Sequence, residues 1–134
     1  MKTPRQVAAI VASTKKRRKA AQEHKSFAAL RAAPAALGSA AAGGSLQAFK
    51  LPANARLALS VNAPTVTGQV TAAINGHTLG IMGGKAGAVQ PLGLWERGQE
   101  LVIKRAAGGP AGTVTLYVLD DWSRPSPIAT GTFT

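Results

Sequence analysis

Residues 70–79 read Val-Thr-Ala-Ala-Ile-Asn-Gly-His-Thr-Leu, and this stretch decides the fold class. Val70, Ala72 and Ile74 recur at every second position, which is the period of a strand with one buried face. Asn75-Gly76 follows at once, and both central residues of a type I′ turn need the positive φ that Asn and Gly tolerate. The stretch therefore predicts a β-hairpin.

The same alternation continues through the rest of the chain from residue 46. It recurs in Leu57, Leu59 and Val61, in Leu101 and Ile103, and in Val114, Leu116 and Val118. Turn signals rich in Gly, Pro and Asn separate these sets, which predicts seven or eight short strands. The expected strands cover 46–51, 55–62, 66–75, 77–82, 86–94, 99–106, 113–121 and 127–133. Such spacing is typical of a small antiparallel β-sandwich, jelly-roll-like or immunoglobulin-like, or of a barrel.

Residues 1–33 form a different kind of sequence, a basic and Ala-rich arm. The first forty residues carry nine Lys/Arg against one acid, a net charge of +8, whereas residues 41–134 carry seven against four, a net charge of +3. Thr3-Pro4 has the form of a helix start, and Pro34 disfavours helix in the residue before it. We expect a partly helical arm with a basic run at its centre: Lys15, Lys16, Arg17, Arg18 and Lys19.

Apolar side chains lie near the two ends of this arm. Val7, Ile10 and Val11 have helical spacing near its start, and Phe27 and Leu30 lie near its end. A helix with so few apolar contacts gains little from packing on itself. We therefore predict that these five residues anchor the arm to a partner, and that the basic run contacts a partner or nucleic acid.

Residues 34–45 are almost entirely Ala, Gly, Ser and Pro, which predicts a flexible linker between the arm and a β domain over 46–134. With 134 residues there is room for one small core, so help from partners or oligomers is expected. No cysteine is present, which excludes disulfides and thiolate metal sites. The short apolar run near Val7 does not fit a signal peptide, and no stretch fits a spanning helix, so a soluble protein is expected.

No catalytic, metal or cofactor site is predicted. Asp120 and Asp121 are adjacent on an expected strand, so their side chains point to opposite faces. His24 lacks a second ligand at metal-binding spacing. His77 has no local acid that would support a Ser/His/Asp arrangement. The stretch 80–86, Gly-Ile-Met-Gly-Gly-Lys-Ala, lacks the residues and the strand-to-helix context of a phosphate loop, and we interpret it as a hairpin loop with a basic tip.

Trp95 and Trp122 lie at the ends of expected strands and are the two tryptophans of the chain. Such side chains serve as core or interface anchors, or as platforms on which a sugar or a base stacks. A role as core or interface anchors is favoured. Sheets that bind nucleic acid typically carry several aromatic residues on one face, and this chain has few aromatic residues.

The order of basic arm, small-residue linker and compact β domain resembles the layout of bacteriophage virion proteins of the capsid decoration, cement and minor head type. This resemblance implies a non-enzymatic structural protein in many copies, located in a virion, whose arm ties neighbouring shell subunits together. Two other hypotheses stay open: a cellular or viral nucleic-acid-binding protein whose arm neutralises phosphates, and a glycan-binding display domain. The alternative to a virion location is the cytoplasm.

Overall fold

The fold is given by a computed structural model, which describes residues 27–134. Residues 27–32 are helical, and nine strands follow within the described range. The strands are β1 (Ala35–Ala40), β2 (Phe49–Lys50), β3 (Ala55–Val61), β4 (Val70–Ile74), β5 (His77–Gly80), β6 (Val89–Trp95), β7 (Glu100–Arg105), β8 (Gly112–Leu119) and β9 (Pro125–Phe133).

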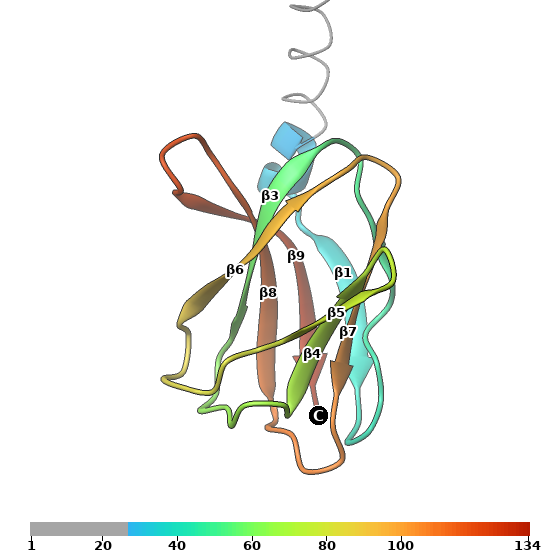
Figure 1. The fold of residues 1–134 in the computed structure, drawn as a ribbon, viewed down its shortest axis with the longest axis vertical. Coiled ribbons are helices and arrows are strands. Elements are labelled where there is room, and N and C mark those ends of the chain that lie inside the picture. The colour runs from blue at the N-terminus through green and yellow to red at the C-terminus, as the bar shows by residue number, and fades with distance from the viewer. Residues whose placement is uncertain (1–26) are drawn as a thin grey trace, which may run out of the picture.

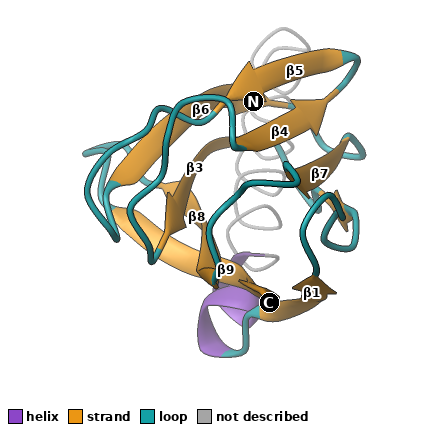
Figure 2. Cartoon of the chain, turned by 90° about the horizontal axis from the view of Figure 1, so that it is seen from below, coloured by secondary structure: helices purple, strands orange, loops and turns teal. Residues whose placement is uncertain are grey.

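The strands form two sheets that face each other (Figures 1 and 2). One sheet has the order β1-β9-β8-β3-β6 and the other the order β2-β7-β4-β5. Neighbouring strands are antiparallel except β1 and β9, which run parallel. These strands confirm the prediction of a mainly β fold. Over residues 27–134 the sheets do not close into a barrel, so the barrel alternative is wrong.

Apolar side chains from both sheets fill the space between them. Leu57 and Leu59 of β3 are completely buried, and they belong to one core with Val70 of β4 and Ile103 of β7. Burying a side chain of this size stabilises the fold by about 1.5–3 kcal/mol. The alternating residues of the sequence are therefore the ones that hold the two sheets together.

The hairpin predicted over 70–79 is confirmed. β4 and β5 pair so that Ile74 lies opposite His77, with Asn75 and Gly76 between them at φ values of 48° and 75°. Each of the eight predicted strands contains or overlaps one observed strand, from β2 to β9. The observed strands are mostly shorter, because pairing ends before the alternation does.

The flexible linker predicted over 34–45 is wrong for half of its length, because β1 lies inside it. β1 pairs with β9, with Ala35 opposite Ala129 and Ala40 opposite Phe133. Backbone hydrogen bonds do not depend on side-chain size, so an Ala-rich segment can form an edge strand where apolar residues are buried on one face. Leu37 and Ala40 supply that face, since each is 3% exposed.

The end of the predicted arm also belongs to the folded domain. The helix ends where expected, just before Pro34, and the Ala33 amide still donates to the Ala29 carbonyl at 3.0 Å. Phe27 is buried in the domain core and Leu30 packs against it. The prediction that these two residues anchor a partner is therefore corrected: they fasten the helix to its own domain. The other predicted anchors, Val7, Ile10 and Val11, and the basic run lie outside the described residues.

Removing the Leu37 side chain tests whether β1 is part of the fold. We expect Leu37→Ala to lower the free energy of unfolding by about 2–5 kcal/mol, because it leaves a cavity beside Leu46 and β9. Chemical denaturation of the full chain measures this change. Ser39→Ala on the exposed face of β1 is the control. Equal stability of the Leu37→Ala and wild-type chains would contradict the assignment.

Candidate functional site

The turn between β8 and β9, residues 120–124, is held by a network of hydrogen bonds around Asp120. Its Oδ1 accepts from the amides of Trp122 and Arg124, both at 2.9 Å, and its Oδ2 accepts from the Arg124 Nε at 2.8 Å. The Asp120 carbonyl accepts from the Ser123 amide at 2.9 Å and from the Arg56 guanidinium at 2.7 Å. These bonds hold Ser123 at a φ of 58°, a conformation that few non-glycine residues adopt.

The Asp120 carboxylate is the centre of this network. The Arg124 amide, which donates to it, holds the pKa of Asp120 below its usual value, and the Arg124 guanidinium and the Trp122 amide act in the same direction. Burial opposes the shift without cancelling it. Asp120 therefore stays ionised at neutral pH, when its two oxygens accept all three bonds.

The turn presents Trp122 to solvent. The side chain is 80% exposed, the largest exposed fraction among the exposed large apolar residues of 27–134. The alternative that Trp122 is a core anchor is therefore wrong, while its role as an interface anchor stays a prediction. A tryptophan on a fixed turn loses little conformational freedom when it is buried by a partner.

Asp120→Asn should release the turn while leaving the fold intact. The folded-state pKa of Asp120 is lowered, so the carboxylate stabilises the turn at neutral pH and stops doing so as the pH falls through that pKa. We expect the indole N–H resonance of Trp122 to broaden or shift in Asp120→Asn at neutral pH, and in the wild-type chain on acidification. The Trp95 indole in the same spectrum is the control. If the Trp122 resonance is the same in the wild-type and Asp120→Asn chains, the Asp120 carboxylate does not hold the turn that carries Trp122.

Trp95, the other predicted interface aromatic, is arranged differently. Its indole Nε1 donates to the Leu92 carbonyl at 2.9 Å, and its ring lies 6.0 Å from that of His77. It packs against the core and is half-buried. The structure thus places Trp95 at the side of the domain core, whereas Trp122 points outward from a turn.

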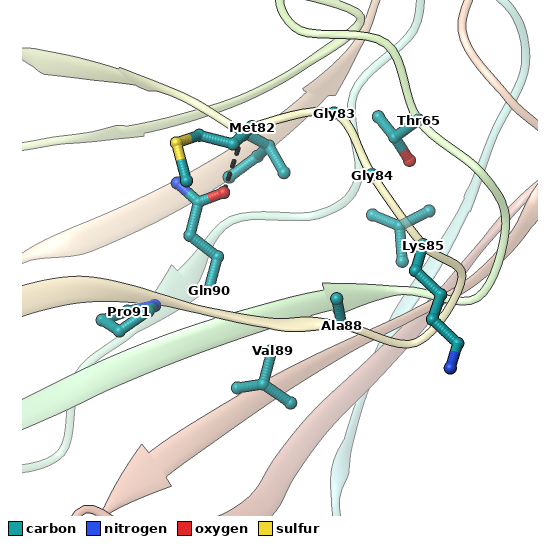
Figure 3. Close-up of a pocket in the computed structure, with 11 residues that line it drawn as sticks. Thr65, Met82, Gly83, Gly84, Lys85, Ala88, Val89, Gln90 and Pro91 are labelled. Carbon is teal, nitrogen blue, oxygen red and sulfur yellow. Dashed lines mark hydrogen bonds between the residues drawn. The ribbon is translucent and has the colours of Figure 1, made fainter.

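A pocket of about 190 Å³ lies beside the start of β6 (Figure 3). Its lining is mainly apolar, and Lys85 and Met82 lie at its two ends in this view. Met82 is 72% exposed and Val89 42% exposed, so part of the apolar lining faces solvent. The residues that line the pocket include Val61, Ile81, Met82, Lys85, Ala88 and Val89.

The glycines of this pocket shape its wall. The segment 81–88 joins β5 of one sheet to β6 of the other, so the hairpin loop interpretation is wrong: the chain crosses between sheets here. The Gly83 amide donates to the Thr67 Oγ1 at 3.2 Å and the Gly84 amide to the Thr65 carbonyl at 2.7 Å. Since both amides have partners within the protein, they do not form a phosphate cradle.

Gly83 and Gly84 offer a matched test of this wall. A Cβ on Gly83 would lie 2.2 Å from the Thr65 carbonyl oxygen, whereas a Cβ on Gly84 would meet nothing within 4 Å. We expect Gly83→Ala to displace the segment and lower the midpoint of thermal unfolding by several degrees, as a loss of about 1 kcal/mol does in a domain of this size. Gly84→Ala should leave it nearly unchanged. Similar midpoints for the two variants would contradict this account.

The titratable residues of the described chain do not form a cluster with metal-ligand composition. No group of three or more His, Asp, Glu or Cys is gathered within residues 27–134. The Asp120 carboxylate is bonded to Arg124, and His77 is exposed at the start of β5. The structure instead has two separate surface features that are candidate sites: the turn carrying Trp122 and the pocket beside β6.

Trp122 is identifiable as a candidate from the sequence, whereas the pocket is not. Its lining comes from β3, from β6 and from two loops, and only the fold brings these segments together. The one sequence signal for the pocket is Gly83-Gly84. Glycine often marks a place where another backbone passes close by, and here the backbone of Thr65 passes close to Gly83.

No protein-family model matches this chain, and a search of the curated proteins finds no match either. Between residues 27 and 134, no helix has the length and apolar character needed to span a membrane.

Proposed function

We propose that this chain is a non-enzymatic structural protein that acts in many copies, as a decoration, cement or minor head component attached to a virion shell. The observation that carries the proposal is Trp122. The hydrogen bonds of the 120–124 turn hold a large apolar side chain in solvent, where it adds nothing to the core. Trp is among the residues that dominate binding at protein interfaces.

The division of charge supports the same proposal. Residues 1–26 carry eight Lys/Arg against one acid, a net charge of +7, and residues 27–134 carry eight against four, a net charge of +4. The basic segment precedes Phe27, which is buried in the core of the folded domain. In the proposed function Val7, Ile10 and Val11 bind neighbouring shell subunits, and Lys15 to Lys19 add electrostatic contacts.

For the finer topology we propose an immunoglobulin-like sandwich over a jelly roll. Immunoglobulin-like domains carry strands C, F and G side by side in one sheet and B, E and D in the other. The orders β3-β8-β9 and β2-β7-β4 match these when β2, β3 and β4 are B, C and D, and β7, β8 and β9 are E, F and G. β5 and β6 are then an insertion between D and E.

Nucleic-acid binding is the second candidate, and the basic run favours it. If its five residues each contact a phosphate, affinity should fall roughly 500-fold between 50 and 200 mM salt, at a slope of about −0.9 per contact. An arm anchored through apolar contacts to protein should weaken much less, because these contacts are not screened.

Two arm variants of the full chain separate the candidates. In one, Val7, Ile10 and Val11 are replaced by Ser; in the other, the five basic residues are replaced by Gln. Lysine-directed crosslinking with mass spectrometry on the wild-type assembly, isolated at physiological salt, identifies what Lys15, Lys16 and Lys19 contact. We expect crosslinks to one repeating protein, and detachment of the Ser variant.

Other results of the same experiment would contradict the structural-protein proposal. Retention of the Ser variant, loss of the Gln variant and release of the wild-type chain by nuclease would support nucleic-acid binding instead. Thr113→Ala, on an exposed position of β8, serves as the variant that should change neither contact.

A further inference from the structure

The Trp122 turn and the pocket beside β6 lie at opposite ends of the domain. Arg56, near the start of β3, pairs with Leu119 and bonds to the turn, whereas Val61, at the end of β3, lines the pocket. At about 3.3 Å per residue, these two positions on β3 are roughly 17 Å apart. In Figure 1 the β8–β9 turn is at the upper left, and the start of β6 lies lower on the same side. Trp122 of one molecule is therefore too far from the pocket of the same molecule to contact it. It can contact the pocket of a second copy.

The two features are complementary in size. An apolar cavity of about 150 Å³ holds a benzene ring. The pocket of about 190 Å³ is larger and open to solvent at Met82 and Val89, so it offers space for an indole ring. Its apolar walls match the face of the ring, and contact would remove exposed apolar surface on both sides.

They are also complementary in charge. Asp121 is exposed beside Trp122, and its neighbour Asp120 is the one that pairs with Arg124. Lys85 is exposed at one end of the pocket. In the proposed contact the Trp122 ring lies in the pocket of a second copy with Asp121 of the first copy on the side of Lys85 of the second. This pairing matters because a chain of net charge +11 otherwise repels its copies.

We infer that the chain binds a second copy of itself head to tail, with Trp122 of one copy seated in the pocket of the next. This inference deepens the proposed function, on which it rests, by naming a partner and the two surfaces that meet. When one such contact joins two copies, the pair is left with one free Trp122, on one copy, and one free pocket, on the other. Such a heterologous contact builds a ring or a filament, whereas a symmetric contact stops at two copies.

The experiment measures the mass of the nuclease-treated full chain in solution by analytical ultracentrifugation over a range of concentrations. We expect the wild-type chain to form species larger than a dimer. Trp122→Ala should weaken association by about 30-fold or more, the effect of removing a binding hot spot. Ala88→Trp should fill the pocket and do the same. Leu94→Ala, which removes another exposed apolar side chain, is the matched control.

Mixing the two defective variants gives the decisive result. Trp122→Ala keeps its pocket and Ala88→Trp keeps its Trp122, so a head-to-tail contact predicts that the mixture forms a one-to-one dimer and nothing larger. A mixture that stays monomeric overturns the inference. So does a wild-type chain that remains a monomer up to about 1 mM, or a Trp122→Ala chain that associates like the wild type.

A charge exchange tests the second contact without altering the core. Asp121→Lys and Lys85→Asp should each weaken association, and a chain carrying both changes should recover it. Lack of recovery overturns the proposed pairing. Since the arm is intact in every one of these chains, attachment to a shell can still be measured, so failure of self-association and failure of the proposed function are distinguishable.

Discussion

Burial of apolar side chains between the two sheets is the constraint on which the rest of the structure depends. β3 is central to it, because it has neighbours on both sides in its sheet and directs Leu57, Leu59 and Val61 into the core. The ends of β3 also position both surface features. Arg56 reaches the Asp120 carbonyl at one end, and Val61 forms part of the pocket at the other. A change that shifts β3 along its axis would displace both together.

Arg105 shows how a polar side chain helps to join the two sheets. It is 6% exposed, and its guanidinium donates to the carbonyls of Ala40 and Gly109 at 3.0–3.2 Å. The same group lies 5.7 Å from the ring centroid of Phe133, which adds a cation–π contact. One side chain of β7 thus links the end of β1, the loop before β8 and the end of β9. A buried charge of this kind is tolerated because its donors are satisfied by carbonyls.

The sequence predicted the elements whose cause is local. Asn75-Gly76 and the alternation of Val70, Ala72 and Ile74 act over a few residues, and the structure agrees with them. β1 was missed because its Ala-rich sequence has no strand signal, and it pairs with a strand almost a hundred residues later. Trp122 was predicted as a candidate interface residue, but its exposure could not be predicted, because it depends on the hydrogen bonds around Asp120. The pocket was missed because its lining comes from segments far apart in the sequence.

The edges of the two sheets bear on the proposed contact between copies. An exposed edge strand invites pairing with another chain. Here the edges are β1, β6, β2 and β5. β2 and β5 are short, and β1 has a register shift near Gly38. β6 carries Pro91, which lacks an N–H, and the Gln90 side chain bonds to the Gly80 carbonyl and the Met82 amide across that edge. Because each edge is short, irregular or covered, growth by adding strands is disfavoured, and this favours the proposed contact through side chains at the two ends of the domain.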